Sequence, residues 1–218
     1  GVEWSRQGYD AQELENVYTG NDARADIVIS ELHNKVVDVL RMRALGFCVS
    51  VAHAEYMAHY FNDHGIPSIA LHGKTPSTER SAAGRKLIDR DIVCIFTVDL
   101  FNEGIDIPEI DTVVFLRPTQ SATIFLQQLG RGLRRSEGKS VLTVLDFVGQ
   151  QNASFRFDLK LRALTHSGRR DLQQQIEHDF PYLPSGCHIS LDRVSKEIVL
   201  ENVRRQIAMT RKQLVADI

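Results

Sequence analysis

The chain has 218 residues, of which 43% are hydrophobic and 25% charged, and its formal net charge is −2 at pH 7. This composition is ordinary for a folded globular protein and supplies no general positive field that would attract a polyanion. No apolar run approaches the ~18 residues of a membrane span and no secretory signal opens the chain, so we expect a cytoplasmic protein without a membrane partner.

Charge and cysteine placement narrow the possible partners further. Residues 1–150 carry 15 Lys and Arg against 20 Asp and Glu, a balance of −5, whereas residues 151–218 carry 11 against 8, a balance of +3. Any polyanion would therefore have to be bound by local groups. The three cysteines, Cys48, Cys94 and Cys187, lie far apart without partners at zinc spacing, so we expect free thiols and no metal site.

The first part of the chain, residues 1–43, is predicted to be a helical lead-in. Two helical patterns cover residues 11–18 and 23–43, and the turn residues 19–22 join them. Further along, short continuous apolar runs alternate with amphipathic segments. The runs are residues 46–51, 67–71, 92–98, 112–116 and 141–147, and the helical patterns between them are residues 53–64, 77–89 and 121–134. Thr75 as N-cap and Pro76 at the first helical position should open the second of these helices.

Continuous apolar runs are typical of parallel strands that are buried on both faces. Their alternation with helices predicts an α/β fold, a doubly wound parallel sheet with helices on both faces, over residues 44–165. The prolines and glycine of residues 180–186 break the chain, so residues 166–218 are predicted to form a mainly helical appendage. Within it we expect one long helix over residues 192–217 and a short edge strand over residues 186–191.

Ligands of such sheets bind outside the carboxyl ends of the strands. Ser50 follows the first predicted strand, and His72 and Gly73 follow the second. Small or polar groups beside helix N-termini suit phosphate oxygens. These three residues are therefore candidates for phosphate contacts at one edge of the sheet, although a histidine at such a position can equally be structural or merely exposed.

The segment after the third predicted strand holds two more candidates. Gly104 permits close approach of the backbone or an unusual dihedral angle. Asp106 could accept a hydrogen bond from a ribose hydroxyl, or it could cap a turn before Pro108. The residues alone leave both interpretations open.

Gln127, Arg131 and Arg134 stand at helical offsets within residues 127–134. Guanidinium groups are permanently charged and match phosphate oxygens bidentately, so the two arginines could hold a phosphate chain. Alternatively they belong to a solvated basic helix end, where cations meet the carbonyl end of the helix dipole favourably.

One stretch resembles a phosphate-binding loop but lacks part of the motif. The stretch Gly73-Lys74-Thr75 looks like the end of that motif, but the motif requires a glycine five residues earlier, where this chain has Ser68. We find neither a triphosphate cradle nor an acidic pair that could be assigned to magnesium.

Four stretches, in this order, carry a family resemblance: residues 47–51, 71–73, 97–106 and 127–134. They resemble motifs IV, IVa, V and VI of the second, RecA-like motor domain of superfamily 2 helicases. The wording Asp-Leu-Phe-Asn-Glu-Gly-Ile-Asp-Ile-Pro in the third stretch is most similar to bacterial DEAD/DEAH-type DNA helicases related to restriction-enzyme motor subunits. RNA-type DEAD-box enzymes have Ala-Arg-Gly where this chain has residues 102–104.

The resemblance implies a motor that binds ATP and Mg²⁺ between two such domains while a nucleic-acid strand, here DNA, crosses both. The first, N-terminal motor domain would supply most of the ATP and Mg²⁺ site, and this fragment alone would be inactive. Arg134 would be the arginine finger on the γ-phosphate, Arg131 would contact the same phosphates, and Gln127 would link that site to neighbouring loops.

By the same resemblance, Gly104 and Asp106 would meet the nucleotide sugar and the domain interface. The strand-binding edge would comprise Ser50, His72, Gly73 and Thr97. An alternative hypothesis is a non-motor nucleic-acid or protein-binding module, in which residues 151–218 dominate. An ordinary doubly wound nucleotide enzyme is disfavoured, because no glycine occurs in residues 49–53 after the first strand.

Overall fold

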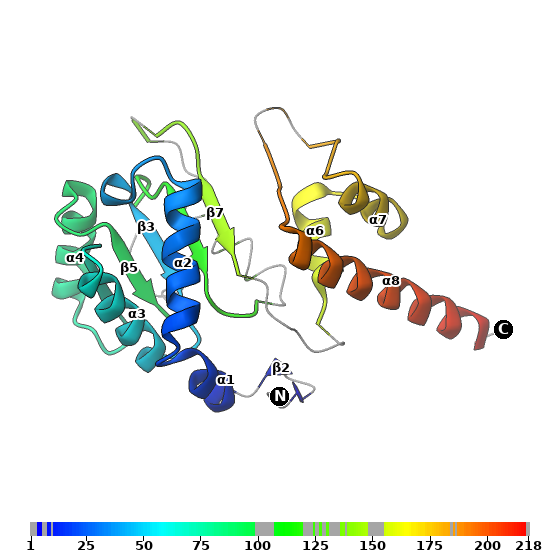
Figure 1. Ribbon diagram of the computed structural model, residues 1–218, viewed down its shortest axis with the longest axis horizontal. Helices are drawn as coiled ribbons and strands as arrows, with labels where there is room; N and C mark the ends of the chain where they lie inside the picture. The colour runs from blue at the N-terminus through cyan, green and yellow to red at the C-terminus, as the bar shows by residue number, and fades with distance from the viewer. Residues whose placement is uncertain are drawn as a thin grey trace. The chain divides into compact units, whose positions relative to one another are not determined.

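The computed structural model describes residues 4–5, 8–9, 11–98, 107–119, 124, 127, 130, 136–137, 139–147, 155–183, 185 and 187–216 (Figure 1). The chain divides into two compact units. The first comprises residues 1–118 and 127–147, and the second comprises residues 119–126 and 148–218.

The first unit is built on a parallel sheet of five strands in the order β4-β5-β3-β6-β7. The strands are β3 (Ala44–Phe47), β4 (Ser68–Leu71), β5 (Cys94–Thr97), β6 (Thr112–Phe115) and β7 (Thr143–Asp146). Every residue of β3, β5 and β6 is buried, as the continuous apolar runs predict. The predicted doubly wound parallel sheet is confirmed.

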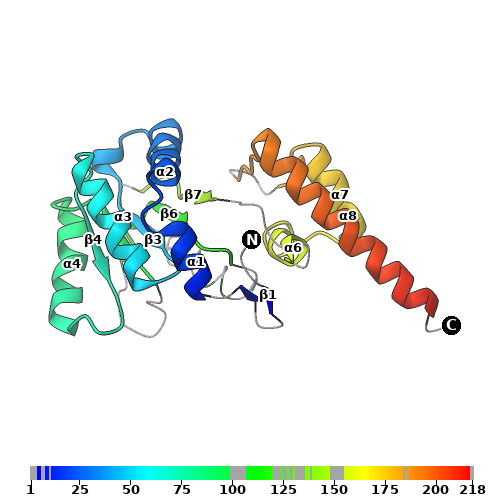
Figure 2. The same cartoon turned by 60° about the horizontal axis from the view of Figure 1, so that its bottom comes forward.

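Helices cover both faces of this sheet. They are α2 (Asp22–Lys35), α3 (Val51–Asp63) and α4 (Ser77–Asp89), and α1 (Ala11–Tyr18) contacts α3. Buried residues of α2 and α3 share one core cluster with alternate residues of the central strands, among them Phe96 and Val114. Figure 2 shows α3 and α4 on opposite sides of β4, which is the arrangement of a doubly wound sheet.

Gly46 lies in the middle of β3, against the ring of Phe96. A Cβ atom built at Gly46 would stand 2.5 Å from Cδ1 of Phe96, closer than van der Waals contact allows. Phe96 in turn meets Phe61 of α3 edge to face, with ring centroids 4.8 Å apart. The glycine therefore makes room for the aromatic pair that joins α3 to the sheet.

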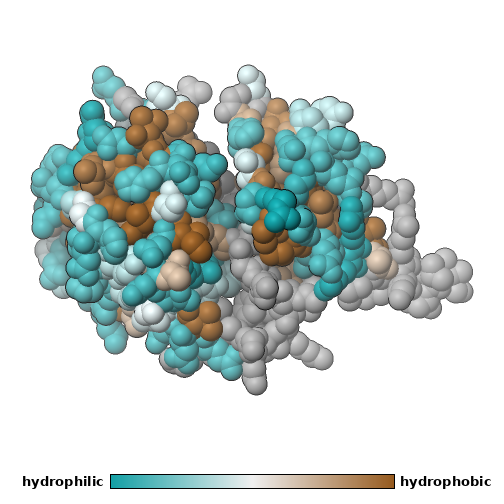
Figure 3. All heavy atoms as spheres, viewed as in Figure 1, coloured by the Kyte–Doolittle hydropathy of each residue, from teal (hydrophilic) through white to brown (hydrophobic). Residues whose placement is uncertain are grey.

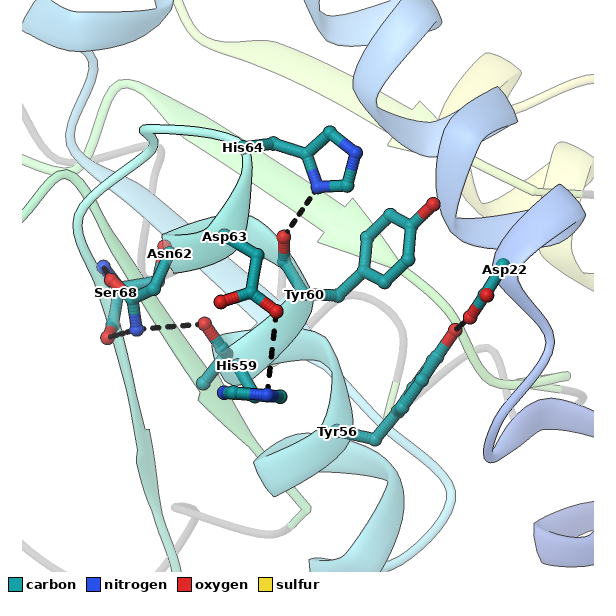
Figure 4. A network of polar contacts seen from close by, with 9 residues as sticks. Asp22, Tyr56, His59, Tyr60, Asn62, Asp63, His64 and Ser68 are labelled. Atoms are coloured by element: carbon teal, nitrogen blue, oxygen red, sulfur yellow. Dashed lines mark hydrogen bonds and ion pairs between the residues drawn. The ribbon is translucent and has the colours of Figure 1, made fainter.

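Polar contacts also attach α3 to its neighbours (Figure 4). The Tyr56 hydroxyl donates to Asp22 Oδ1 at 2.7 Å, and the Tyr60 hydroxyl donates to Asp26 Oδ1 at 2.8 Å. The two pairs are four residues apart on both helices, so they form successive contacts between α2 and α3. Asn62 Nδ2 donates to the Ser68 carbonyl at 2.8 Å, which joins the end of α3 to the start of β4.

Three local predictions in the first unit were wrong. The first strand runs over residues 44–47 rather than 46–51, because Ser50 already caps α3. The predicted helix 23–43 ends at Lys35; Val36 is extended, and Asp38 accepts from the Leu40 amide to open the 3₁₀ helix η1 (Val39–Arg41) instead. Helix α4 has Pro76 rather than Thr75 as its N-cap.

Two very short strands in the lead-in had no sequence signal. They are β1 (Trp4–Ser5) and β2 (Gly8–Tyr9), and they pair antiparallel with each other.

The second unit is a small group of helices, α6 (Phe157–Thr165), α7 (Arg169–Glu177) and α8 (Arg193–Ala216), each in contact with the other two. Its buried apolar residues are Phe155, Phe157, Leu161, Leu172, Ile176, Phe180, Val199 and Val203. By its contacts α6 groups with α7 and α8, whereas the sequence analysis placed residues 157–165 with the sheet. The predicted edge strand is wrong where it can be checked, since residues 187–191 form no strand.

The surface and the thiols add little chemistry. Figure 3 shows small apolar areas among polar side chains on the face that carries α2. Exposed apolar residues scattered in this way are ordinary. Cys48 and Cys94 are buried free thiols, as predicted. Within the described part of the chain, no helix is long and apolar enough to cross a membrane.

Candidate functional site at the carboxyl edge of the sheet

The carboxyl ends of four neighbouring strands lie in one row. Leu71, Thr97, Phe47 and Phe115 are aligned in register across β4, β5, β3 and β6. The segments that follow these strands therefore leave the sheet along a single edge. This edge carries the predicted phosphate contacts from three separate parts of the sequence.

Ser50 caps the N-terminus of α3 at this edge. Its Oγ accepts a hydrogen bond from the His53 amide at 3.1 Å, and its backbone is extended with φ −149°. A capped helix start presents its remaining first-turn amides and the positive end of the helix dipole to whatever lies beyond it. The residue is half-buried, so the cap lies at the rim of the sheet.

His53 holds the loop before α3 through a hydrogen bond to its backbone. The side chain is buried, and its Nδ1 accepts a hydrogen bond from the Val49 amide at 3.3 Å, which places the ring proton on Nε2. Its ring stacks on Tyr18 at 5.5 Å, and the Arg24 guanidinium lies 4.1 Å over the other ring of that stack. Burial first, and then the charge of Arg24, lower the pKa of His53 to about 4, so the imidazole is neutral near pH 7.

The loop after β4 is a tight polar turn. The His72 amide donates to Thr75 Oγ1 at 3.1 Å, the Thr75 amide donates to the His72 carbonyl at 2.9 Å, and the Lys74 amide donates to His72 Nδ1 at 3.2 Å. Thr75 therefore holds this turn rather than capping α4. Gly73 and Lys74 are exposed at its tip, and His72 is half-buried.

Thr97 ends β5 and is fully buried. Its carbonyl accepts from the Cys48 amide at 2.7 Å, while its Oγ1 has no hydrogen-bond partner within the described structure. A buried hydroxyl without a partner costs free energy. The hydroxyl does not reach the surface here, so a direct contact with a nucleic-acid phosphate would need a local shift.

Arg117 is a residue of this edge that the sequence analysis missed. It follows β6, and its Nη1 donates to the Val98 carbonyl, just beyond β5, at 3.0 Å. The signal for it was an arginine directly after an apolar strand, but sequence alone does not say which carbonyl such a side chain would reach.

The helix predicted over residues 121–134 can be checked at three positions. Ile124, Gln127 and Gly130 are all helical, and Gln127 is exposed. The other four predicted nucleotide-site residues, Arg131, Arg134, Gly104 and Asp106, lie outside the described residues. Among the residues described, no group of three His, Cys, Asp or Glu side chains is placed to hold a metal ion.

Four cations of α8 are paired with carboxylates. Lys196 Nζ lies 2.7 Å from Asp179 Oδ1, and Arg204 Nη2 lies 2.7 Å from Glu177 Oε1. Arg193 and Arg205 are likewise paired with Glu197 and Glu201 one helical turn further along or back. These pairs compensate the charge that a polyanion would need.

The five-stranded parallel sheet in the order β4-β5-β3-β6-β7, with helices on both faces, has the fold of RecA-like helicase domains. Residues 27–136, half of the chain, match the family model of the helicase conserved C-terminal domain. The chain belongs to this family.

Two named relatives illustrate the match. IRC3 of Saccharomyces cerevisiae, whose name proposes that it is an ATP-dependent helicase, is 32% identical over 123 residues, which is 56% of this chain and 18% of that protein. UvrABC system protein B of Kosmotoga olearia is 28% identical over 171 residues, 71% of this chain and 24% of that protein. The chain thus spans about a fifth of the length of these relatives.

Solved structures agree on the fold. The DEAD-box protein SrmB of E. coli aligns with a TM-score of 0.53 and 17% identity over 69% of this chain and 82% of the other. A fragment of a protein from Vibrio vulnificus YJ016, whose name proposes that it is an HsdR subunit of a type I restriction enzyme, aligns with a TM-score of 0.51 and 21% identity over 63% of this chain and 28% of the other. The predicted resemblance to helicase C-terminal domains is confirmed, and the restriction-enzyme fragment shares the fold.

Proposed function

We propose that this chain is the C-terminal motor half of an ATP-dependent helicase or translocase that acts on DNA. The observation that supports it most is the alignment of four strand ends, which brings segments distant in sequence to one ligand-binding edge. Family membership and the ATP-dependent helicase named among the relatives support the use of ATP. The wording of residues 99–108, which differs from the Ala-Arg-Gly of RNA-type enzymes, favours DNA.

In this proposal ATP is the substrate and Arg134 is the arginine finger. Its guanidinium donates to the γ-phosphate oxygens as negative charge develops there, and Arg131 contacts the same phosphates. Gln127 is exposed on its helix, which suits a side chain that links the phosphate site to neighbouring loops. Gly104 and Asp106 would meet the nucleotide sugar.

The arginines proposed for the ATP site do not suit Mg²⁺. The two arginines offer no oxygen ligand, and the described part of the chain holds no cluster of carboxylates that could bind the ion. We therefore assign the metal to the other motor domain of the full-length protein and derive no step of this chain from it.

The strand-binding edge comprises Ser50, His72, Gly73 and Thr97. The capped start of α3 and the exposed Gly73 offer backbone amides, which bind phosphates without reading base sequence. When the arginines engage the γ-phosphate the two motor domains approach, and after hydrolysis they separate. The grip of this edge on DNA then moves relative to the grip of the other domain.

The test is Arg134→Ala in the full-length protein, measured as ATP turnover with and without single-stranded DNA. Loss of an arginine finger should lower turnover about 10³–10⁵-fold. Arg134→Lys should recover little, because an ammonium cannot reproduce the guanidinium fork.

A matched control is Arg85→Ala, which removes an exposed arginine of α4 that belongs to no proposed site. It should turn over ATP like the wild type. Turnover of Arg134→Ala within threefold of the Arg85→Ala control would refute the finger role.

A further inference from the structure

Two residues flank the carboxyl end of β3, one just beyond each neighbouring strand. On one side the Cys48 amide donates to the Thr97 carbonyl at 2.7 Å, and on the other the Leu116 amide donates to the Phe47 carbonyl at 2.9 Å. The next residues outward are Val98 beyond β5 and Arg117 beyond β6. The central strand β3 lies between them.

The Arg117 side chain reaches from one to the other. Its Nη1 donates to the Val98 carbonyl at 3.0 Å, although β5 and β6 are two strand spacings apart, roughly 10 Å. The guanidinium must therefore pass over the end of β3. Burial, and then the thiol of Cys94, raise the pKa of Cys48, whereas the charge of Arg117 lowers it, which agrees with a guanidinium close to this strand end.

We propose that Arg117 is a positioning residue for the strand-binding edge: it ties the ends of β5 and β6 together across β3 and so fixes Thr97 relative to the loop that holds Ser50. This inference rests on the proposed function of the edge. The residue acts through backbone groups and contacts neither DNA nor ATP itself. Its loss frees the Val98 carbonyl and lets the strand ends separate.

The chain supplies a matched control at the opposite end of the sheet. Arg43 precedes β3, is half-buried like Arg117, and donates through Nε and Nη2 to the Ile88 carbonyl at 3.1 and 2.9 Å. Both arginines thus bind a carbonyl far away in sequence. Only Arg117 lies at the carboxyl edge, so a purely structural role predicts equal consequences for the two Met variants.

The experiment compares Arg117→Met, Arg117→Lys and Arg43→Met in the full-length protein. In Arg117→Met, hydrogen exchange of the Cys48 amide should accelerate about tenfold, and the single-stranded oligonucleotide concentration for half-maximal binding should rise about tenfold. Arg117→Lys should fall between this variant and the wild type. Arg43→Met should lower the urea midpoint while both quantities stay at wild-type values.

Every outcome of this experiment either supports or overturns the proposed role of Arg117. Unchanged exchange at Cys48 in Arg117→Met overturns the proposal, whether or not the protein binds DNA. Equal changes in Arg117→Met and Arg43→Met also overturn it, since the effect would then be general destabilisation. A fall of about 1 in the slope of log affinity against log salt would make Arg117 a phosphate contact instead. A wild-type protein that does not bind the oligonucleotide refutes the proposed function, while the exchange measurement still tests the tie itself.

Discussion

The two ends of the β-sheet treat their polar groups differently. At the amino edge, side chains bind the protein's own backbone. Arg43 donates to the Ile88 carbonyl. Arg90 Nε donates to the Arg41 carbonyl at 2.8 Å, and Lys139 Nζ donates to the Pro108 carbonyl at 3.1 Å. Asp111 Oδ1 accepts from both the Arg43 amide and the Thr112 hydroxyl, each at 2.9 Å.

The carboxyl edge instead keeps polar groups at its rim. Gly73 is exposed, and the buried Thr97 hydroxyl has no partner among the described residues. Ser50, Thr75 and Arg117 also bind backbone groups at this edge, so the contrast rests on Gly73 and on the Thr97 hydroxyl. Substitutions at the two edges should therefore have different effects. At the amino edge they should change stability only, whereas at the carboxyl edge they should change stability and DNA binding separately.

The largest effect that we expect concerns His53, which supports the carboxyl edge. Its folded pKa of about 4 lies below the ~6.5 of an unfolded histidine, so the unfolded chain binds more protons between these values. Stability should therefore fall as pH drops from 6.5 to 4, by on the order of 3 kcal/mol from this residue. Protonation would place an N–H on Nδ1 against the Val49 amide, next to the charge of Arg24 and the ring of Tyr18.

The measurement is urea unfolding of the chain at pH 7 and at pH 4. His53→Asn keeps an acceptor for the Val49 amide but cannot titrate, so its stability should fall less over this interval. His59→Asn removes an exposed histidine of the same helix and should follow the wild type (Figure 4). If His53→Asn and the wild type lose equal stability between pH 7 and pH 4, the prediction of a neutral, buried His53 is wrong.

At the amino edge we expect Asp111→Ala to be the most damaging polar substitution. It leaves the half-buried Arg43 amide and the Thr112 hydroxyl without their acceptor, which should cost about 2 kcal/mol of unfolding free energy. Asp111→Asn retains an oxygen at this position and should cost less. In the full-length protein at 25 °C, where both variants remain folded, DNA affinity should equal that of the wild type. A tenfold loss of DNA affinity in Asp111→Ala would break the contrast between the edges.

Ser50→Ala tests the carboxyl edge with a smaller structural effect. Loss of the cap on α3 should cost about 1 kcal/mol, as for other N-caps, because the His53 amide loses its acceptor. The same substitution should weaken oligonucleotide binding in the full-length protein. Ser50→Asp restores the cap and the stability but adds a negative charge at the proposed phosphate contact. It should therefore bind DNA more weakly than Ser50→Ala, and equal binding by the two variants would argue against a phosphate beside Ser50.

The sheet could be predicted well from the sequence, because a strand that is buried on both faces is a continuous, mainly apolar run. Strands β5 and β6 are examples. Helix ends were predicted less well, because they depend on competing short-range bonds. Asp38 binds the Leu40 amide, which ends the α2 pattern early, and Thr75 binds the His72 amide instead of capping α4.

The candidate site was predicted in its location but not in its internal contacts. Residues such as Ser50 and His72 could be assigned to one edge, because parallel strands share their carboxyl ends. The tie from Arg117 to Val98 could not be predicted, since it requires β5 and β6 to flank β3, an order that differs from their order in the chain. The nucleotide-site roles of Arg131 and Arg134 stay predictions.

The smallest effect should have the opposite sign. Thr97→Val replaces a buried hydroxyl that lacks a partner with a methyl group of similar size, so unfolding free energy should rise by up to about 1 kcal/mol. Thr112→Val is the control at the start of β6: its hydroxyl is also buried but donates to Asp111, so the variant should lose stability. If DNA binding needs the Thr97 hydroxyl, Thr97→Val will be more stable and yet bind the oligonucleotide more weakly than the wild type. A Thr97→Val protein that gains stability and binds DNA normally would remove Thr97 from the strand-binding edge, since its hydroxyl would then serve neither the fold nor the ligand.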